Sequence, residues 1–277
     1  MPEIPEVEAF KSYIKSHCMN KPIADISISA AKIIHGVSPA TFKKTIIDNK
    51  FTHIERRGKF LIIKLAKLNK YVVMHFGLTG SVHCTKEDAT VRFSAVRFIF
   101  KNHTVLHFKS IRKFGKIWLV SDPDKIKTLR TMGPDALALT QKEFKAILEK
   151  NGSRNIKAVL MDQAKIAGIG NEYADEILFQ AHIDPHHSIK QLSGAQLGAL
   201  YRHMKSVLRY ATSVQKKAIK HVSAGEFFSK EDRKMFKSSY MQAHRHIDMI
   251  CPKNRKHRLK TATIAGRTTY YCPIDQV

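Results

Sequence analysis

The sequence predicts an α+β protein with a β-rich first half and an α-rich second half. Residues 51–84 contain short apolar runs rich in β-branched and aromatic residues, interrupted by Gly58, Gly77 and Gly80, which is typical of strands joined by turns. From Thr140 onward, apolar residues recur mainly at helical spacing. The chain has 277 residues, enough for one large domain or two ordinary ones.

The first half is expected to begin with a helix and to continue as strands. Residues 3–16 predict a helix because Val7, Phe10 and Ile14 fall on one face. Two strand-like segments, 92–100 and 104–111, are separated by three polar residues and predict a β-hairpin. A further strand is expected over 114–120.

The second half is expected to be helical. A threonine that can cap a helix begins the segment 140–150. Segments 155–163 and 171–181 also have helical spacing and are joined by the glycine-containing stretch 164–170. Residues 193–220 predict one long helix or two.

Glycine and proline interrupt the pattern near 131–139, and the domain boundary is expected there. From about Ala243, the chain returns to strand and turn character. The predicted organisation is a first domain over 1–130, a hinge over 131–139, a helical domain over 140–242 and a terminal hairpin over 243–277.

Net charge is the strongest global signal. Lys and Arg total 48 against 23 Asp and Glu, a formal charge of +25. A chain this basic attracts polyanions and gains affinity by releasing counterions from nucleic acid. An acidic membrane surface is the alternative, but no basic amphipathic anchor is evident. Nucleic acid is therefore the predicted partner.

Several other classes of protein are disfavoured. No apolar run approaches the length of a transmembrane helix, and the acidic start MPEIPEVEAF lacks the apolar core of a secretory signal. The four cysteines are sparse and widely spread, which argues against a disulfide framework. We expect a cytoplasmic, bacterial nucleoid-associated protein that binds no membrane, and a monomer.

The N-terminus has the residues of a catalytic device. Loss of Met1 would expose the secondary amine of Pro2, and a terminal amine with a pKa of roughly 7.7–8.0 is partly neutral near neutral pH. Its attack on a sugar C1′ gives an iminium that promotes elimination. Glu3 could relay protons, and Glu6 lies one helical turn further on. The alternative is an ordinary helix start, where Glu complements the dipole.

Seven segments spread over nearly the whole chain form an ordered pattern. They are MPEIPEVE (1–8), RRGKFL (56–61), HFGLTGS (75–81), IRKFG (111–115), MGPDAL (132–137), LMDQAKIAGIGNEYADEILF (160–179) and GRTTYYCP (266–273). In this order they resemble the motifs of the formamidopyrimidine-DNA glycosylase/endonuclease VIII (Fpg/Nei) family. The resemblance implies an N-terminal β-sandwich with an N-terminal helix, followed by a helix–two-turn–helix domain that ends in a zinc-finger-like β-hairpin.

The resemblance also implies a reaction. Pro2 would be the Schiff-base nucleophile and Glu3 the general acid. Lys59 would steady the leaving-group region and assist elimination, and Arg267 would hold a phosphate and assist the second elimination. The implied activity is excision of oxidised bases, of the 8-oxoguanine/formamidopyrimidine type or oxidised pyrimidines, followed by β,δ-elimination. This chemistry requires no cofactor.

Damaged DNA is the implied partner, and its target base must leave the stack. Leu78, Arg112 and Phe114 match the residues that fill the gap: an apolar side chain wedges between bases and a cation bonds the orphaned base. The alternative is that Leu78 and Phe114 are core residues, the usual fate of such side chains.

Four further residues are expected to contact phosphates. Lys113 stands where the family has an arginine, which keeps the charge but loses the bidentate fork. Asn171 follows a glycine-rich turn at a helix start, where backbone amides can hold a phosphate. Arg154 and Lys157 precede this unit and are further candidates.

The finger departs from the family pattern, which has two C-x2-C pairs. Here the pairs end in Asn254 and Asp275, so that two of four thiolates are absent. A zinc site needs four N, S or O ligands. The metal alternative uses Cys251, His257, Cys272 and Asp275, with His244 and His246 as other nitrogen donors. The sequence favours a finger without zinc, held by packing and hydrogen bonds.

Two more departures concern the loops. Ser110 and Ile111 replace an Asp-Pro pair, and residues 223–241 lack the glycine-rich loop that cups oxidised purines in the family, so that the lesion preference stays open. A second interpretation is a catalytically weak binder of damaged, abasic or single-stranded DNA, and a third is an RNA-binding protein. Retention of the full implied catalytic set favours the enzyme, and that set is Pro2, Glu3, Lys59 and Arg267.

Overall fold

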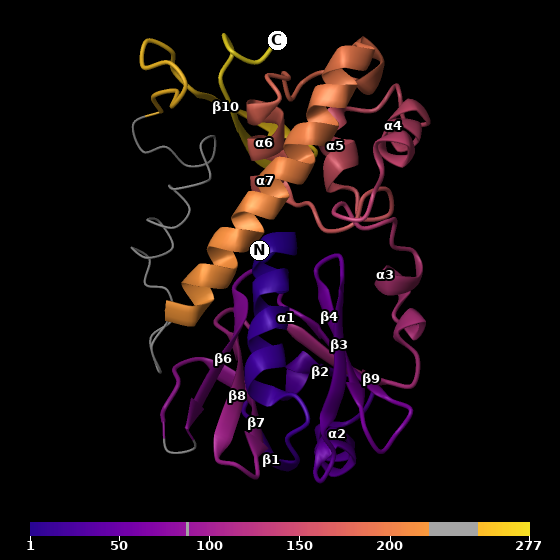
Figure 1. The fold of residues 1–277 in the computed structure, drawn as a ribbon, viewed down its shortest axis with the longest axis vertical. Coiled ribbons are helices and arrows are strands. Elements are labelled where there is room, and N and C mark those ends of the chain that lie inside the picture. Colours follow the sequence, from indigo (N-terminus) through magenta and orange to yellow (C-terminus); the bar gives the residue numbers. More distant parts are fainter. Residues whose placement is uncertain (87–88, 222–248) are drawn as a thin grey trace. The chain divides into compact units, whose positions relative to one another are not determined.

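The computed structural model describes residues 1–86, 89–221 and 249–277. The described residues form two compact units (Figure 1). The first unit contains Met1–Thr131 and the end of helix α7 from Thr212, and the second contains Met132–Ala211 and the C-terminal residues from 249. The segment 223–241, where the sequence lacks the family's glycine-rich loop, lies outside the described residues, as do His244 and His246.

Two sheets form a sandwich in the first unit, as the resemblance implied. One has the strand order β2-β9-β5-β4-β3, and the other is antiparallel with the order β1-β7-β8-β6. The strands are β1 (Ile23–Ile28), β2 (Ile34–His35), β3 (Phe51–Arg57), β4 (Phe60–Leu65), β5 (Tyr71–His75), β6 (Gly80–Lys86), β7 (Ser94–Phe100), β8 (Thr104–Ser110) and β9 (Lys116–Val120). A short helix, α2 (Pro39–Ile46), connects β2 to β3. The predicted β7–β8 hairpin and the strand after it are confirmed.

Helix α1 (Ile4–Cys18) confirms the predicted opening helix. It runs along the sheets of the first unit (indigo in Figure 1). Its face with Val7, Phe10 and Ile14 is buried in a core shared by both sheets. The ring centroids of Phe10 and Phe76 lie 4.7 Å apart. The Phe76 ring stacks on the ring of Phe108, with 5.5 Å between their centroids. Alternating strand residues supply the rest of this core because side chains on one face of a strand repeat every second residue.

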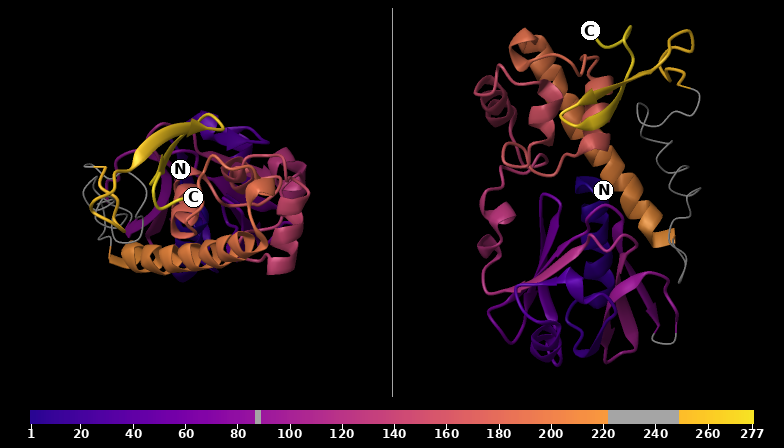
Figure 2. Two further views of the ribbon diagram at one scale, coloured as in Figure 1. Left: turned by 90° about the horizontal axis from the view of Figure 1, so that it is seen from above. Right: turned by 180° about the vertical axis from the view of Figure 1, so that it is seen from behind.

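The second unit is helical. It contains α4 (Gln141–Glu149), α5 (Ile156–Met161), α6 (Asn171–Gln180) and most of α7 (Gly194–His221), and it ends in the hairpin β10 (Lys260–Ile264) and β11 (Arg267–Tyr271). A short helix, α3 (Lys127–Arg130), precedes it in the chain. Residue Thr140 caps α4 as predicted: its hydroxyl accepts from the Glu143 amide at 3.3 Å. The hairpin, yellow in Figure 2, contacts α6 through β11.

Helix α7 is continuous, which selects one long helix over two. Its last turns belong to the first unit, because Ile219 is buried in the core there and Gln215 bonds Glu6. The predicted domain span of 140–242 therefore does not match the units: the chain changes unit inside the helix. None of the described helices combines the length and the apolar character needed to cross a bilayer.

The buried His83 and His107 and the half-buried His75 lie in the first unit, and the pKa of each is lowered to about 4. Burial is the main cause for all three, and nearby cations add to it: Lys59 acts on His75, and Arg97 acts on His107. In His107 both ring nitrogens have partners at 2.9 Å, the hydroxyls of Thr85 and Ser94. His83 is the third of these histidines. These rings are therefore neutral in the folded protein near neutral pH.

We predict that acid destabilises the fold through these histidines. Between their folded pKa of about 4 and the unfolded value of about 6.5, the unfolded chain binds protons that the folded chain does not. The free energy of unfolding should therefore fall as the pH drops through this window and stay level above it. Urea unfolding at pH values of about 7 and about 5 measures the change.

His107→Gln should weaken this pH dependence, whereas the exposed His53→Gln should leave it unchanged. Equal stability of the wild type at the two pH values would contradict the account.

Candidate functional site

Pro2 directly precedes Glu3, which is the N-cap residue of helix α1. The Glu3 side chain is only 2% exposed. The backbone amide of Glu3 donates to Oε2 of Glu6 at 2.9 Å. The side-chain amide nitrogen of Gln215 donates to Oε1 of Glu6 at 3.1 Å. One carboxylate oxygen of Glu6 thus holds the residue that begins helix α1, and the other accepts from helix α7, which gives Glu6 a positioning role.

Lys59 lies in the tight turn between β3 and β4. Arg57 pairs with Phe60, which leaves a two-residue turn of Gly58 and Lys59. Gly58 has φ +54, in the left-handed region that such turns require. Lys59 is only 5% exposed, although a lysine in a hairpin turn would ordinarily point into solvent.

An ion pair joins this hairpin to helix α1. Arg56 Nε donates to Glu8 Oε2 at 2.9 Å, and Arg56 Nη1 donates to the carbonyl of Gly58 at 3.0 Å. Burial alone would raise the pKa of Glu8, but the hydrogen bonds and charges of Lys11 and Arg56 outweigh it and lower this pKa. The helix that carries Pro2 and the turn that carries Lys59 therefore share one connection.

The two predicted wedge residues lie on neighbouring loops. Leu78 is 39% exposed and Phe114 is 56% exposed, so neither is a core residue. The loops approach closely at Gly77, where an added Cβ would lie 2.5 Å from the carbonyl oxygen of Phe114 and where φ is +57. Only glycine allows this approach.

Ser110 shapes the second of these loops. Its hydroxyl accepts from the amide of Gly115 at 3.1 Å, and its carbonyl accepts from the amide of Lys113 at 3.1 Å. Arg112 and Lys113 are exposed beside Phe114, and Lys113 has a positive φ of 54. The departure from the family at Ser110 thus supplies a side chain that closes the loop.

The turn between α5 and α6 is organised by Gln163, a residue that the sequence analysis missed. Its amide nitrogen donates to the carbonyls of Met161 and Ile169 at 2.8 and 2.7 Å, and its oxygen accepts from Gly168 at 2.9 Å. Asn171 begins α6 after this turn. Its amide nitrogen donates to the Thr268 carbonyl at 2.9 Å, which connects the helix start to strand β11.

Arg267 is exposed at the start of β11. It pairs with Ile264 across a two-residue turn of Ala265 and Gly266, both with positive φ. This turn type matches the natural twist of a hairpin. The structure thus presents Arg267 at the tip of the hairpin.

The expectation that Lys157 contacts a phosphate is wrong. Lys157 is fully buried, and its ammonium lies 2.6 Å from Asp175 Oδ1 and donates to the Thr269 hydroxyl at 2.6 Å. The other Asp175 oxygen accepts from the amide of Tyr270 at 3.2 Å. A buried lysine paired in this way has no access to DNA. Arg154, by contrast, is 41% exposed beside Asp162 and remains a candidate phosphate contact.

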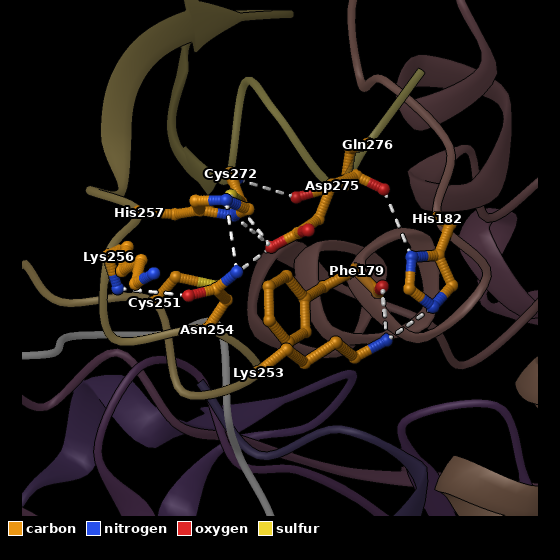
Figure 3. Close-up of polar contacts among 10 residues, drawn as sticks. All are labelled: Phe179, His182, Cys251, Lys253, Asn254, Lys256, His257, Cys272, Asp275 and Gln276. Carbon is orange, nitrogen blue, oxygen red and sulfur yellow. Dashed lines mark hydrogen bonds and ion pairs between the residues drawn. The ribbon is translucent and has the colours of Figure 1, made fainter.

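The structure brings together the four alternative metal donors of the finger (Figure 3). Asp275 Oδ2 lies 3.2 Å from Cys251 Sγ, 3.1 Å from Cys272 Sγ and 2.9 Å from His257 Nδ1. Two thiols, an imidazole and a carboxylate are all donor types that zinc accepts. The residues present therefore fit a zinc ion by donor type and number.

We predict that Gly77→Ala disturbs both wedge loops, because its Cβ would collide with the backbone of Phe114 and the positive φ disfavours alanine. The free energy of unfolding should fall by roughly 1–3 kcal/mol, and affinity for abasic-site DNA should fall with it. Calorimetry and fluorescence anisotropy measure the two effects. Gly194→Ala, where a Cβ meets no atom within 4 Å, is the matched control, and equal effects of both substitutions would refute the assignment.

Two family models match the chain. The formamidopyrimidine-DNA glycosylase N-terminal domain matches residues 1–117, and the formamidopyrimidine-DNA glycosylase H2TH domain matches residues 132–223. Similar solved structures include a complex of Lactococcus lactis Fpg with DNA that contains N7-benzyl-Fapy-dG, with a TM-score of 0.84, 24% identity and 99% coverage of both chains. A complex of Lactococcus lactis Fpg with abasic-site DNA has a TM-score of 0.85, 24% identity and the same coverage. These likenesses show the shared fold.

Sequence relatives extend over the whole chain. A protein named formamidopyrimidine-DNA glycosylase from Pelotomaculum thermopropionicum is 30% identical over 100% of this chain and 99% of its own length. One of the same name from Arabidopsis thaliana is 32% identical over 99% of this chain and 70% of its own length. The predicted family is confirmed: the chain belongs to the formamidopyrimidine-DNA glycosylase (Fpg/Nei) family of DNA-repair enzymes.

Proposed function

We propose that this protein excises oxidised bases from DNA and then cuts the strand as an abasic-site lyase, with the amine of Pro2 as nucleophile. The observation that carries the proposal is the arrangement around α1. Pro2 adjoins the buried carboxyl of Glu3, and the same helix is joined to the Lys59 turn through Glu8 and Arg56. The names of the relatives support the oxidised-base class of substrate.

In the excision step, the Pro2 nitrogen forms a bond to C1′ while the bond from C1′ to the base breaks. The departing base takes up a proton, which Glu3 can supply. The amine nitrogen then loses its own proton, and its lone pair forms a double bond to C1′ while the C1′–O4′ bond of the sugar ring breaks and O4′ takes up a proton. The product is an iminium, which is permanently cationic because Pro2 is a secondary amine. The Glu6 carboxylate accepts a hydrogen bond from the backbone amide of Glu3 at 2.9 Å, so that Glu6 acts as a positioning residue.

In the lyase step, the iminium withdraws electrons from C2′. Loss of a C2′ proton expels the 3′ phosphate, and a second elimination expels the 5′ phosphate. Lys59 and Arg267 would stabilise the charge on these leaving phosphates. Lys59 lies in the tight turn of one hairpin, and Arg267 directly follows the tight turn of another. No step requires a metal or another cofactor.

DNA binding rests on the exposed side chains of two loops and on the helical unit. Leu78 and Phe114 are apolar yet exposed, as an unstacking wedge must be. The exposed side chain of Arg112 would form a hydrogen bond with the base left unpaired opposite the extruded one. Lys113 would bind a phosphate of the DNA backbone. We assign phosphate contacts in the helical unit to Arg154 and Asn171, and a hinge to residues 131–139. A monomer bound to damaged DNA is the expected complex.

Borohydride trapping tests the nucleophile. On oligonucleotides with 8-oxoguanine, formamidopyrimidine, an oxidised pyrimidine or an abasic site, the wild type should give a covalent adduct in denaturing gels. Pro2→Gly and protein that retains Met1 should give none. Lys64→Ala, an exposed lysine on β4, should trap normally. A protein that binds abasic DNA but traps no adduct would favour the alternative function, a catalytically weak binder of damaged, abasic or single-stranded DNA.

Glu3→Gln separates the two steps within the same assay. Removal of the acid should slow base excision by about a hundredfold or more, the usual range for general acid catalysis, whereas lyase activity on a preformed abasic site should persist. Equal loss of both activities would show that Glu3 is not the acid.

A further inference from the structure

Two cysteines that the proposed reaction does not use lie in contact in the first unit. Cys18 is the last residue of helix α1, and Cys84 lies in strand β6. Both thiols are free, and their sulfur atoms are 3.5 Å apart although the residues are separated by 66 positions in the chain. This distance exceeds the S–S bond of about 2.05 Å by only about 1.5 Å. A small shift of the side chains would therefore allow a disulfide to form.

Contacts with helix α1 hold Cys84 in place. Its backbone amide donates to the Tyr13 hydroxyl at 3.2 Å, and its sulfur meets that of Cys18. Strand β6 is the last strand in the order of its sheet, where it pairs with β8 (Figure 1). Helix α1 thus contacts this edge strand through two residues, Tyr13 and Cys18, and both contacts converge on Cys84.

The two thiols differ in how easily a solute can reach them. Cys18 is fully buried, whereas Cys84 is half-buried. The hydrogen bond from Cys84 and burial raise the pKa of Cys18 well above its ordinary value. Because the thiolate is the reactive form of a cysteine, Cys18 reacts poorly with oxidants in solution. An oxidant therefore meets Cys84 first, and Cys18 lies behind it as the thiol that reacts next.

We propose that Cys18 and Cys84 form an oxidative modification site, at which a hydroperoxide converts the two thiols into a disulfide that braces α1 on β6. This site lies outside the proposed function, because neither cysteine takes part in base excision or strand cleavage. The reactant is a small peroxide, with hydrogen peroxide as the simplest member of the class.

The first step oxidises Cys84. Its thiolate attacks one oxygen of hydrogen peroxide, so that an S–O bond forms and the O–O bond breaks. Cys84 becomes a sulfenic acid, and the departing hydroxide takes up the proton that the thiol had lost and leaves as water.

The second step forms the disulfide. The Cys18 sulfur attacks the Cys84 sulfur, so that the S–S bond forms and the S–O bond breaks. The hydroxyl leaves with the thiol proton of Cys18 as a second water. In sum, two thiols are oxidised by one peroxide, which is reduced, and the products are one disulfide and two waters.

The disulfide would brace the first unit without touching the proposed catalytic residues. A bond between residues 66 positions apart restricts the unfolded chain and so stabilises the folded one. Helix α1 has 15 residues, which places Cys18 about 22 Å from the helix start beside Pro2. We therefore expect oxidation to raise stability and to leave the rate of adduct formation on abasic DNA unchanged.

Peptide mapping of the full-length protein tests the site. Native protein is treated with hydrogen peroxide, alkylated in denaturant and digested with trypsin without reductant. The expected product joins peptide 16–32 to peptide 71–86 with loss of two hydrogens; Lys21 precedes a proline and resists cleavage. This readout does not depend on catalysis. Cys18 and Cys84 that both remain open to alkylation after peroxide treatment would overturn the proposal, as would their pairing with other cysteines.

Single variants test the order of the two steps. In Cys18→Ala, the oxidised Cys84 has no thiol beside it and should persist as a sulfenic acid, which dimedone labels. In Cys84→Ala, the buried Cys18 should stay reduced and unlabelled. Labelling of Cys18 in Cys84→Ala, with none of Cys84 in Cys18→Ala, would overturn the assigned order.

Calorimetry tests the bracing role. Oxidation of the wild type should raise its Tm by roughly 5–10 °C. Cys84→Ala, treated with peroxide in the same way, is the control, because it retains Cys251 and Cys272 and reports any effect of their oxidation. A Tm rise in the wild type no larger than that in Cys84→Ala would contradict the bracing role.

Discussion

The ion pair of Arg56 and Glu8 joins helix α1 to the hairpin of β3 and β4, and the proposed catalytic arrangement depends on this contact. The side chains are 8% and 14% exposed, and their atoms lie 2.9 Å apart. Lys11 and Lys216 approach the other Glu8 oxygen at 2.6 and 3.7 Å. Loss of one partner from a buried pair costs about 3–5 kcal/mol because the other charge stays buried. Here that cost would fall on the connection between helix α1 and the hairpin of β3 and β4.

A second buried ion pair has the same role in the helical unit. Lys157 and Asp175 join α5 to α6 and, through Thr269, to strand β11. Both hairpins that present a predicted catalytic cation, Lys59 and Arg267, therefore have a tight turn with a glycine and a buried ion pair next to it. In this chain, two ion pairs that are largely shielded from solvent support the hairpins that position Lys59 and Arg267.

Local patterns in the sequence predicted the elements well. The helical face of Val7, Phe10 and Ile14, the Thr140 cap and the β7–β8 hairpin all depend on residues close together in the chain. The exposure of Leu78 and Phe114 was also foreseeable, because glycines flank both loops. Order and spacing of motifs were sufficient to identify the family.

Long-range pairing was not predictable in the same way. From the sequence around it, Lys157 could not be told from a surface lysine. Its burial follows from its contacts with Asp175 and Thr269, which form only in the folded chain. Gln163 stood at the end of the predicted helical segment 155–163, and nothing nearby in the sequence indicated its three hydrogen bonds across the following turn. The convergence of His257 on Asp275 likewise depends on how two separate turns fold together.

A double-mutant cycle on Glu8 and Arg56 tests the central claim most directly. The rate of borohydride-trappable adduct formation on abasic DNA would be measured for Glu8→Ala, Arg56→Ala and the double variant, with the free energy of unfolding in parallel. The account predicts that each single substitution slows the adduct and that the double variant is no slower than either, a coupling of at least about 1 kcal/mol. Unchanged rates, or effects that simply add, would contradict it.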